Sequence, residues 1–276
     1  MKHQVDPIAT KIVSAINDGY ASTDRGRARC YIGASMAGTD CIAQFALSLR
    51  GFPDVKIDPT LQRIFSIGHT IEDVVVRDLK NKAGLRVWEK DDMTGRQHSA
   101  EWLNGHVVCH SDGIVDFEDG SPPAILEIKS MNDANWKKFK GYGVYVSHKK
   151  YYRQMQMMMA MFKIERSFFI AYNKNNSDYH AELVHFDQEE WDGMYVKIQQ
   201  ALDGQAERIG REPEDWRCKS CFKREACWSQ PDLAPACQYC KHSFADKHGT
   251  FSCKFSNKPE LMACEKYEQF RPTPRV

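Results

Sequence analysis

Hydrophobic side chains between residues 61 and 79 recur at the three- and four-residue spacing of a helix that buries one face. These positions are Leu61, Ile64, Ile71, Val74, Val75 and Leu79. Gly84 follows at a place where glycine commonly ends a helix. The segments 149–162 and 188–209 have a similar helical pattern. The pattern therefore predicts three long helices, in addition to a largely helical lead-in before residue 52.

Short apolar or alternating runs between these helices predict β-strands. They lie at residues 85–88, 106–109, 114–117, 124–128, 167–172 and 181–186. The run at 114–117 could continue the strand at 106–109 after a turn. Helices and strands that alternate in this order predict an α/β core with a central mixed sheet flanked by helices.

Changes in pattern divide the 276 residues into three regions. Residues 1–58 form a helical lead-in, residues 59–210 form the α/β core, and residues 211–276 are polar, Cys-rich and only weakly periodic. A chain of this length can bury a substantial core without disulfide bonds. We therefore expect one main domain with a small Cys-rich region after it.

Composition excludes several classes of protein. The hydrophobic fraction of 42% and the charged fraction of 27% are ordinary for a soluble globular chain. Residues 1–21 lack the apolar core of a secretory signal, and the most apolar run, residues 155–162, is too short to cross a membrane. The net charge of +1 decides nothing about nucleic acid. We expect a cytoplasmic protein with no membrane partner.

Ten cysteines in such a chain need an explanation, and seven of them lie between Cys218 and Cys264. Disulfide bonds are rare in the reducing cytoplasm. Clustered thiols without an export signal are more often metal ligands. The C-terminal region is therefore predicted to bind metal, whereas Cys109 needs no role beyond that of a small hydrophobic residue on a strand.

Asp112 follows one predicted strand, and Glu127-Ile128-Lys129 ends another. Side chains alternate along a strand, so Glu127 and Lys129 point the same way while Ile128 points into the core. Carboxylates are suitable ligands for Mg²⁺ or Mn²⁺, which polarise a phosphoryl oxygen and activate water. Lys129 can orient the water or stabilise the transition state. An edge strand with a solvent-facing Glu–Lys pair would explain the tripeptide alone, but not its combination with Asp112.

Four motifs in this order resemble those of the PD-(D/E)XK nuclease superfamily, in its RecB-like branch. They are Gly68-His69-Thr70-Ile71-Glu72, Cys109-His110-Ser111-Asp112, Glu127-Ile128-Lys129 and Tyr151-Tyr152-Arg153-Gln154. Cys109 stands where the second motif usually has glycine, and Met158 stands where a variant of the fourth has tyrosine. The resemblance covers residues 31–228 and implies a restriction-endonuclease-like core.

The resemblance also implies the roles of individual residues. Glu72, Asp112 and Glu127, together with the backbone of Ile128, would bind the divalent metal. His69 lies one helical turn before Glu72 and is a further candidate ligand, although a partly exposed helix histidine is an equal alternative. Lys129 would be catalytic, and Tyr151 and Gln154 would help to position the substrate.

By this resemblance the chain is expected to be a Mg²⁺- or Mn²⁺-dependent DNA exonuclease of a phage or mobile element. It would act on single- or double-stranded DNA ends in a bacterial or phage-infected cell, with a single-strand annealing protein as a candidate partner. Two alternatives stay open. One is a CRISPR-associated RecB-type adaptation nuclease, and the other is a non-catalytic, zinc-containing DNA-binding module. The sequence does not fix the oligomeric state.

The stretch from Glu127 to Arg153 contains six lysines and one arginine against one glutamate and one aspartate, a net charge of +5. Cations neutralise phosphates, and aromatic residues that lie between them can stack on bases. The predicted DNA-binding residues are Lys137, Lys138, Lys140, Lys149, Lys150 and Arg153. The alternative is that the aromatic residues belong to the core and the lysines to a solvated face.

The spacing of Cys218, Cys221 and Cys227 resembles the C-terminal iron–sulfur signature of RecB-like and AddB-like nucleases. In those proteins a fourth cysteine comes from far upstream, and here Cys41 is the preferred ligand, with Cys30 as the second choice. The resemblance thus implies a 4Fe–4S cluster, with zinc as the alternative metal. Thiolates from both ends of the chain would join the lead-in to the tail.

The other four C-terminal cysteines, Cys237, Cys240, Cys253 and Cys264, predict a structural tetrahedral Zn²⁺ site. His242 and His248 could substitute as ligands. A rival assignment places zinc on Cys218, Cys221, Cys237 and Cys240, which also have a standard zinc spacing. The rival leaves three nearby cysteines without a role, so the division into two sets of four is preferred.

Overall fold

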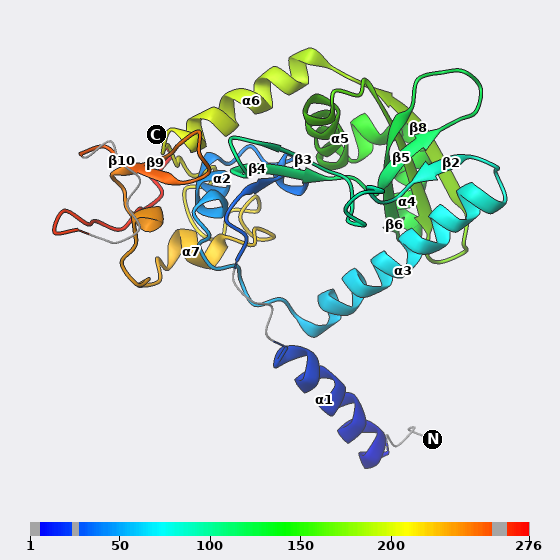
Figure 1. Ribbon diagram of the computed structural model, residues 1–276. Coiled ribbons are helices and arrows are strands. Elements are labelled where there is room, and N and C mark those ends of the chain that lie inside the picture. Colours follow the sequence, from blue (N-terminus) through cyan, green and yellow to red (C-terminus); the bar gives the residue numbers. More distant parts are fainter. Residues whose placement is uncertain (1–5, 24–27, 256–263, 276) are drawn as a thin grey trace.

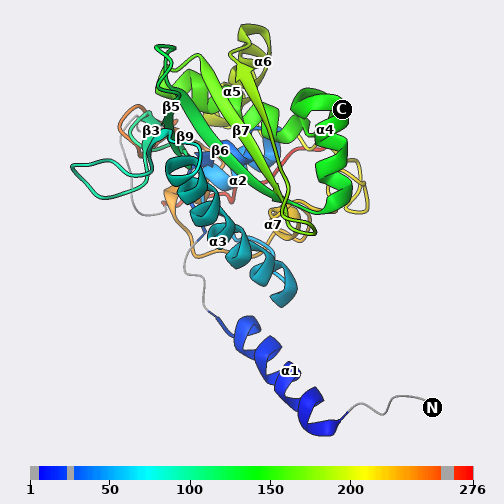
Figure 2. The same cartoon turned by 90° about the vertical axis from the view of Figure 1, so that its right-hand side faces the viewer.

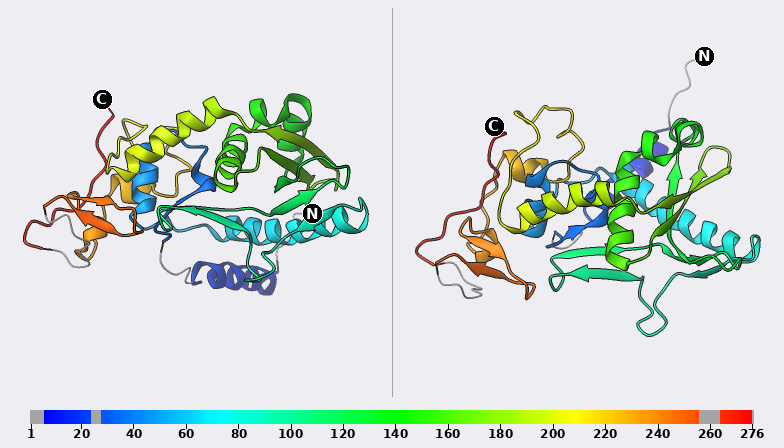
Figure 3. Two further views of the ribbon diagram at one scale, coloured as in Figure 1. Left: turned by 45° about the horizontal axis from the view of Figure 1, so that its top comes forward. Right: turned by 90° about the horizontal axis from the view of Figure 1, so that it is seen from above.

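The computed structural model describes residues 6–23, 28–255 and 264–275. The strands in these ranges form a five-stranded, a three-stranded and a two-stranded sheet. Figure 3 shows the five-stranded sheet and the C-terminal two-stranded sheet at opposite ends of the molecule. None of the described helices combines the length and the apolar character that crossing a membrane requires.

The five-stranded sheet carries two of the predicted catalytic residues, Glu127 and Lys129. Its spatial order is β2 (Arg86–Trp88), β5 (Gly113–Asp116), β6 (Ala124–Met131), β7 (Arg166–Asn173) and β8 (Tyr179–His185). β6 and β7 are parallel, and the other neighbouring pairs are antiparallel. The predicted α/β class with a mixed sheet flanked by helices is therefore confirmed, and the Cys-rich region follows it.

Helices cover both faces of this sheet (Figures 1 and 2). α3 (Pro59–Asn81) packs on one face, where Ile71, Val75 and Leu79 meet Leu126 and Ile128 of β6. α5 (Lys149–Phe162) packs on the other face, with α4 (Asp133–Ser147) beside it. α6 (Gln188–Leu202) continues this second layer and contacts α5. β6 is thus buried on both sides.

The start of α3 follows from its sequence. Asp58 caps the helix, because its Oδ1 accepts a hydrogen bond from the Thr60 backbone N–H at 2.7 Å. Pro59 occupies the first turn, where its missing N–H costs no hydrogen bond. α1 (Pro7–Ala21) projects from the body (Figure 1) and meets α3 near Gln62, whose Nε2 donates to the Tyr20 carbonyl at 3.2 Å.

A smaller sheet joins the lead-in to the core. β1 (Ile32–Gly33) runs parallel to β4 (Val107–His110), and β3 (Ser99–Trp102) pairs with β4 in the antiparallel sense. β4 and β5 therefore belong to different sheets, so the run at 114–117 does not continue the strand at 106–109. Asp112 lies at the point where the chain passes from one sheet to the other.

The lead-in and the C-terminal region lie side by side (Figures 1 and 3). Their elements are η1 (Ala34–Met36), α2 (Ile42–Leu49), α7 (Arg224–Trp228), η2 (Cys237–Tyr239), β9 (Ser243–Ala245) and β10 (Phe251–Cys253). α2 is almost wholly buried and packs against α6 and α7. The first and last parts of the sequence therefore share one hydrophobic core with α5 and α6.

Several elements differ from the sequence prediction, and two of them are long helices. The helix predicted at 188–209 ends at Leu202, because the chain turns at Gly204, whose φ of +86° is in the left-handed region. α4 was not predicted, since its two glycines and its aromatic residues mask the helical period, and Gly143 kinks it at φ +68°.

Candidate functional site

Glu127 and Lys129 lie on the same side of β6, the side that faces α5. Glu127 is only 1% exposed, whereas Leu126 and Ile128 point to the opposite face. Asp112 stands directly before β5, and its Oδ2 accepts a hydrogen bond from the Ile128 backbone N–H at 2.7 Å. The structure thus brings the second and third motifs together at one place on the sheet.

Glu127 is the best-enclosed acidic side chain of the site. Its Oε1 accepts a hydrogen bond from Nε2 of Gln154 at 2.8 Å and forms an ion pair with Nζ of Lys129. Burial raises the pKa of the Glu127 carboxyl to about 7, although the Lys129 ammonium opposes the rise. The negative charges of Asp112 and Glu72 add to it. Three carboxyl groups therefore interact electrostatically within one site.

Lys129 is held as a cation. Its Nζ donates to the Ile128 carbonyl at 3.0 Å and lies 5.6 Å from the centroid of the Tyr151 ring. Burial lowers the pKa of Lys129, but Glu127 and Asp112 more than reverse this effect, so the pKa is raised overall. The ammonium is therefore positioned among carboxylates and beside the ring of the fourth motif.

Glu72 and His69 come from α3 and lie nearer the surface. His69 Nδ1 and Glu72 Oε2 are 3.2 Å apart, and the His69 side chain is 80% exposed. Glu72 also acts electrostatically on Glu127. Glu72, Asp112, Glu127 and Lys129 thus form one charged cluster, and the exposed His69 lies at its edge.

The residues at this site suit a hard divalent cation. Carboxylate and carbonyl oxygens are the ligands that Mg²⁺ and Mn²⁺ prefer. Bringing a cation to Glu127, Asp112 and Glu72 would also relieve the mutual repulsion that raises the pKa of Glu127. Within the described ranges, no three Cys, His, Asp or Glu side chains already stand close enough to hold a metal ion. Binding would therefore require small side-chain movements.

Metal binding at Glu127 should depend on pH. The pKa of the Glu127 carboxyl is about 7 in the folded protein and 4.5 when the group is unperturbed, so folding favours the protonated form. In metal-free protein this protonation stabilises the fold fully below about pH 4.5, and the stabilisation is lost as the pH rises through about 7. A divalent cation must displace the proton. We expect Mn²⁺ to raise the Tm more at about pH 8 than at about pH 5.5. Scanning fluorimetry tests this, and equal shifts at both pH values would argue against Glu127 as a ligand.

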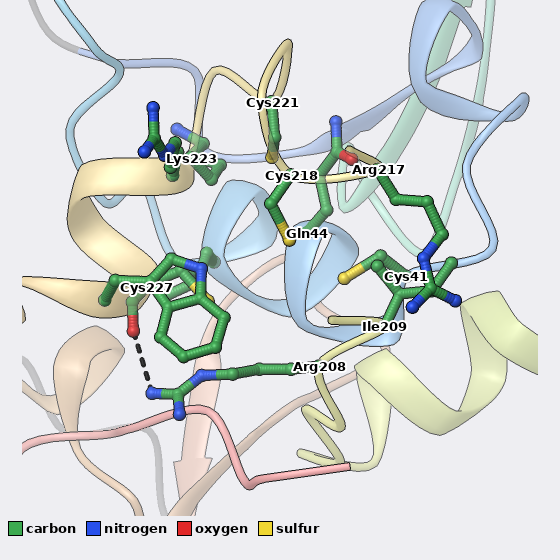
Figure 4. Close-up of a pocket in the computed structure, with 12 residues that line it drawn as sticks. Cys41, Gln44, Arg208, Ile209, Arg217, Cys218, Cys221, Lys223 and Cys227 are labelled. Atoms are coloured by element: carbon green, nitrogen blue, oxygen red, sulfur yellow. Dashed lines mark hydrogen bonds between the residues drawn. The ribbon is translucent and has the colours of Figure 1, made fainter. Parts of the chain in front are cut away.

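The four cysteines of the predicted iron–sulfur set line one pocket (Figure 4). Cys41 is the residue that precedes α2, Cys218 and Cys221 lie in the turn before α7, and Cys227 is in α7. Cys30 does not line this pocket; its thiol lies instead against Gly51. Of the two upstream candidates, the structure therefore brings Cys41 to the C-terminal thiols.

Basic side chains surround these thiols. Arg208, Arg217, Lys223 and Arg224 line the same pocket. Arg208 Nη2 donates to the Cys227 carbonyl at 2.9 Å, and its guanidinium lies 4.3 Å from the centroid of the Trp228 ring. Burial raises the pKa of the Cys227 thiol to about 11, and Arg208 opposes this rise. Sequence reasoning missed these cations, because nothing in their local pattern separates them from ordinary surface residues.

The remaining C-terminal cysteines lie in a different place. Cys237 begins η2, Cys240 follows it, and Cys253 ends β10, which packs against η2. These three side chains are buried, and Cys264 is exposed. The rival zinc set combines two of these cysteines with Cys218 and Cys221, yet the latter two line the other pocket with Cys41.

The six predicted DNA-binding residues fall on α4 and α5. Lys137, Lys138, Lys140 and Lys150 are exposed. Lys149 and Arg153 both form ion pairs with Glu190, at 2.6 Å for Arg153 Nε, so their charges are already partly neutralised.

Aromatic residues of the same stretch divide into two groups. Trp136 and Phe139 are buried in the core, whereas Tyr142 and Tyr145 are exposed. The alternative in which aromatic residues serve the core is therefore correct for the first pair. The second pair stands on the surface among the α4 lysines and is available to stack on bases.

No family model matches this chain, and no curated protein matches it. Among solved structures, SSO0001 is 12% identical with a TM-score of 0.45, over 82% of this chain and 98% of that one. An alkaline exonuclease from Laribacter hongkongensis is 17% identical with a TM-score of 0.46, over 68% and 90%. A phage-related exonuclease from Haemophilus somnus 129PT is 14% identical with a TM-score of 0.43, over 62% and 91%. We draw no functional argument from likeness at these values.

Proposed function

We propose that this chain is a Mg²⁺- or Mn²⁺-dependent deoxyribonuclease that hydrolyses phosphodiester bonds from DNA ends. One observation carries the proposal. Glu127 is fully buried, is contacted by Lys129 and Gln154, and shares its electrostatic environment with Asp112 and Glu72. Burying the Glu127 carboxyl group beside an ammonium and two further carboxyl groups in a purely structural role would be costly. A site that binds a cation and a phosphate accounts for that cost.

Each residue of the site has a chemical role in this reaction. When bound by Glu72, Asp112, Glu127 and the Ile128 carbonyl, the divalent cation supplies Lewis-acid polarisation of the phosphate and an activated water. Lys129 keeps its proton and stabilises the negative charge that develops on phosphoryl oxygen. Gln154 holds the Glu127 carboxylate in a fixed orientation.

The order of the four motifs supports the finer assignment to the RecB-like branch of the PD-(D/E)XK superfamily. Glu72 on α3 and Asp112 before β5 act electrostatically on Glu127 of β6, and Gln154 on α5 donates a hydrogen bond to the same carboxyl group. Exonuclease action in phage or mobile-element recombination, with an annealing protein as partner, is the part of the proposal that rests on the resemblance alone.

We also propose that Cys41, Cys218, Cys221 and Cys227 hold an iron–sulfur cluster. Four thiols around one pocket are the donor set that such a cluster needs. A cluster held by four thiolates carries net negative charge, which the surrounding arginines and lysines would stabilise. The cluster would tie the start of α2 to α7 and would therefore be structural, since it lies outside the carboxylate site.

DNA would approach over α4, whose exposed lysines and tyrosines flank the fourth motif. Phosphate contacts by Lys137, Lys138 and Lys140 would provide affinity without sequence preference. Exposed Tyr142 and Tyr145 offer stacking surfaces for unpaired bases. Lys150 extends the same basic surface onto α5.

Replacement of Lys129 by methionine separates a chemical from a structural role. The methionine fills a similar volume, so we expect a fall in cleavage rate of roughly 10²–10³-fold, the usual effect of losing one group that stabilises transition-state charge. Single-turnover cleavage of labelled DNA measures the rate, and thermal unfolding measures stability. A variant that is unfolded at ambient temperature would instead assign Lys129 a packing or ion-pair role.

Digestion of end-labelled DNA, with and without divalent metal, tests the proposed activity directly. Release of labelled nucleotides from one end distinguishes exonuclease action from internal cleavage, which yields a range of longer labelled fragments. Variants that lack Asp112 or Glu127 serve as the catalytically inactive references.

A further inference from the structure

Arg50 is the most completely buried charged side chain of the C-terminal junction. It directly follows α2, and its exposed fraction is 0%. Nη1 donates to the carbonyls of Gln238 at 2.8 Å and Cys240 at 3.0 Å, and to Ser243 Oγ at 2.8 Å. Nη2 donates to the Ser243 carbonyl at 2.8 Å. The guanidinium therefore binds the backbone around η2 and β9.

Among the residues that the structure describes, none supplies an anionic partner for this buried cation. In the described part of the chain, no carboxylate forms an ion pair with Arg50, and its Nε has no hydrogen-bond partner. The rings of Phe251 and Phe270 lie 5.1 Å and 4.1 Å from its central carbon. Carbonyls and ring faces compensate the charge only partly, because they carry no net negative charge, and a buried charge without a counter-charge is unfavourable.

The groups beside Arg50 that can become anionic are cysteine thiols. Cys240 contacts the guanidinium directly, because its backbone carbonyl accepts one of the Arg50 hydrogen bonds. Cys237 and Cys240 form a tight turn in which the Cys240 N–H donates to the Cys237 carbonyl at 3.0 Å. Such a Cys-x₂-Cys turn is common in structural zinc sites.

A third cysteine, Cys253, lies on the adjacent hairpin of β9 and β10. Cys253 pairs in register with Ser243, the residue that accepts two of the Arg50 hydrogen bonds. The Phe255 backbone N–H donates to Cys253 Sγ at 3.5 Å. Sulfur is a weak acceptor as a thiol and a much better one as a thiolate. This contact directs a backbone N–H at the sulfur atom that would bind the metal.

We propose that Cys237, Cys240, Cys253 and Cys264 bind one Zn²⁺ as thiolates, and that the net negative charge of this centre is the counter-charge of Arg50. Four thiolates and one Zn²⁺ carry a net charge of −2, which is the missing anion beside the guanidinium. The centre would thereby lock the C-terminal hairpin onto the end of α2. In the described part of the chain, the thiols are not close enough together to bind one metal ion. Zinc binding would therefore draw the hairpin and Cys264 together. This site is independent of the proposed nuclease activity.

Differential alkylation of the full-length native protein tests the ligand set without any variant. Zinc is first measured by mass spectrometry, and we expect about one ion per chain in addition to any iron, as a Cys₄ site requires. Maleimide labelling with and without a zinc chelator then identifies the thiols that zinc protects. Cys237, Cys240, Cys253 and Cys264 should become reactive together. Zinc-free protein, or chelator-dependent exposure of Cys218 and Cys221 with Cys237 and Cys240, would overturn the assignment.

Variants test the role of Arg50. Cys253→Ser should lose the zinc, whereas Cys30→Ser, which changes an exposed thiol elsewhere, should keep it. Arg50→Met should speed zinc transfer to a chelator by roughly tenfold or more, the effect of losing one partly compensated charge, and Arg50→Lys should restore part of the protection. Unchanged transfer from Arg50→Met would overturn the charge-partner role. If Arg50→Met does not fold, Arg50→Gln decides, because it also removes the charge, and an unaltered transfer rate in this variant would overturn the charge-partner role.

Discussion

Asp112→Asn and Glu127→Gln are each expected to abolish most DNA cleavage. Each change removes a carboxylate that the divalent cation needs, while the shape of the side chain is kept. We expect a loss of about 10³-fold or more, because losing about 4 kcal/mol of transition-state stabilisation has that effect. Cleavage of labelled DNA under single-turnover conditions measures the loss, and binding to DNA should persist because exposed α4 lysines provide most non-specific affinity.

Asp116→Asn is the matched control for these variants. Asp116 lies at the other end of β5, where its Oδ1 accepts a hydrogen bond from the Glu118 N–H at 2.9 Å. Asp116 has the same side chain as Asp112 but lies outside the charged cluster. The Asp116→Asn variant should therefore cleave DNA at a rate close to that of the unaltered protein. Full activity of Asp112→Asn, or equal losses in Asp116→Asn, would refute the site assignment.

Cys41→Ser is expected to remove the iron–sulfur cluster and to destabilise the whole fold. Cys41 stands at the start of α2, far in sequence from the other three thiols, so its loss releases the link between the lead-in and α7. Protein purified without air should change from brown to colourless, because iron–thiolate absorption disappears. We expect the Tm to fall by roughly 5 °C or more, the result of losing about 2 kcal/mol in a chain of this size.

Cys30→Ser distinguishes the two upstream cysteines. Its thiol is exposed and lies outside the pocket, so this variant should keep its iron, its colour and its Tm. If Cys30→Ser loses its iron and Cys41→Ser keeps it, the fourth ligand of the cluster is Cys30 and not Cys41. If the unaltered protein is colourless and contains zinc but no iron, the metal bound by Cys41 and its three partner thiols is zinc, because zinc has no visible absorption.

Much of the charged cluster could be predicted because strand alternation is a local rule. Glu127 and Lys129 share one face of β6, and the helix predicted at 149–162 coincides with α5 (Lys149–Phe162). Periodicity placed Gln154 on that helix, and the motif order placed it after the strand. Local rules therefore gave the right elements, while the 2.8 Å contact between Gln154 and Glu127 required the folded chain.

Features that depend on contacts between distant segments could not be predicted in the same way. Glu190 of α6 pairs with Lys149 and Arg153, which the sequence alone presented as unpaired cations for DNA. Arg50 looks like an ordinary residue at the end of a helix, yet its partners lie about 190 positions later in the chain. β3 was missed because its alternation covers four residues. None of these features produces a recognisable pattern among neighbouring residues in the sequence.

The central claim is that the charged cluster of Glu72, Asp112, Glu127 and Lys129 hydrolyses DNA with the help of a divalent cation. Its most direct test is digestion of end-labelled DNA by the purified full-length chain in Mg²⁺, in Mn²⁺ and in EDTA. We predict progressive release of labelled nucleotides with either metal, none in EDTA, and recovery when metal is returned. DNA that stays intact with both metals while the protein still binds it, or cleavage that continues in EDTA, would contradict the account.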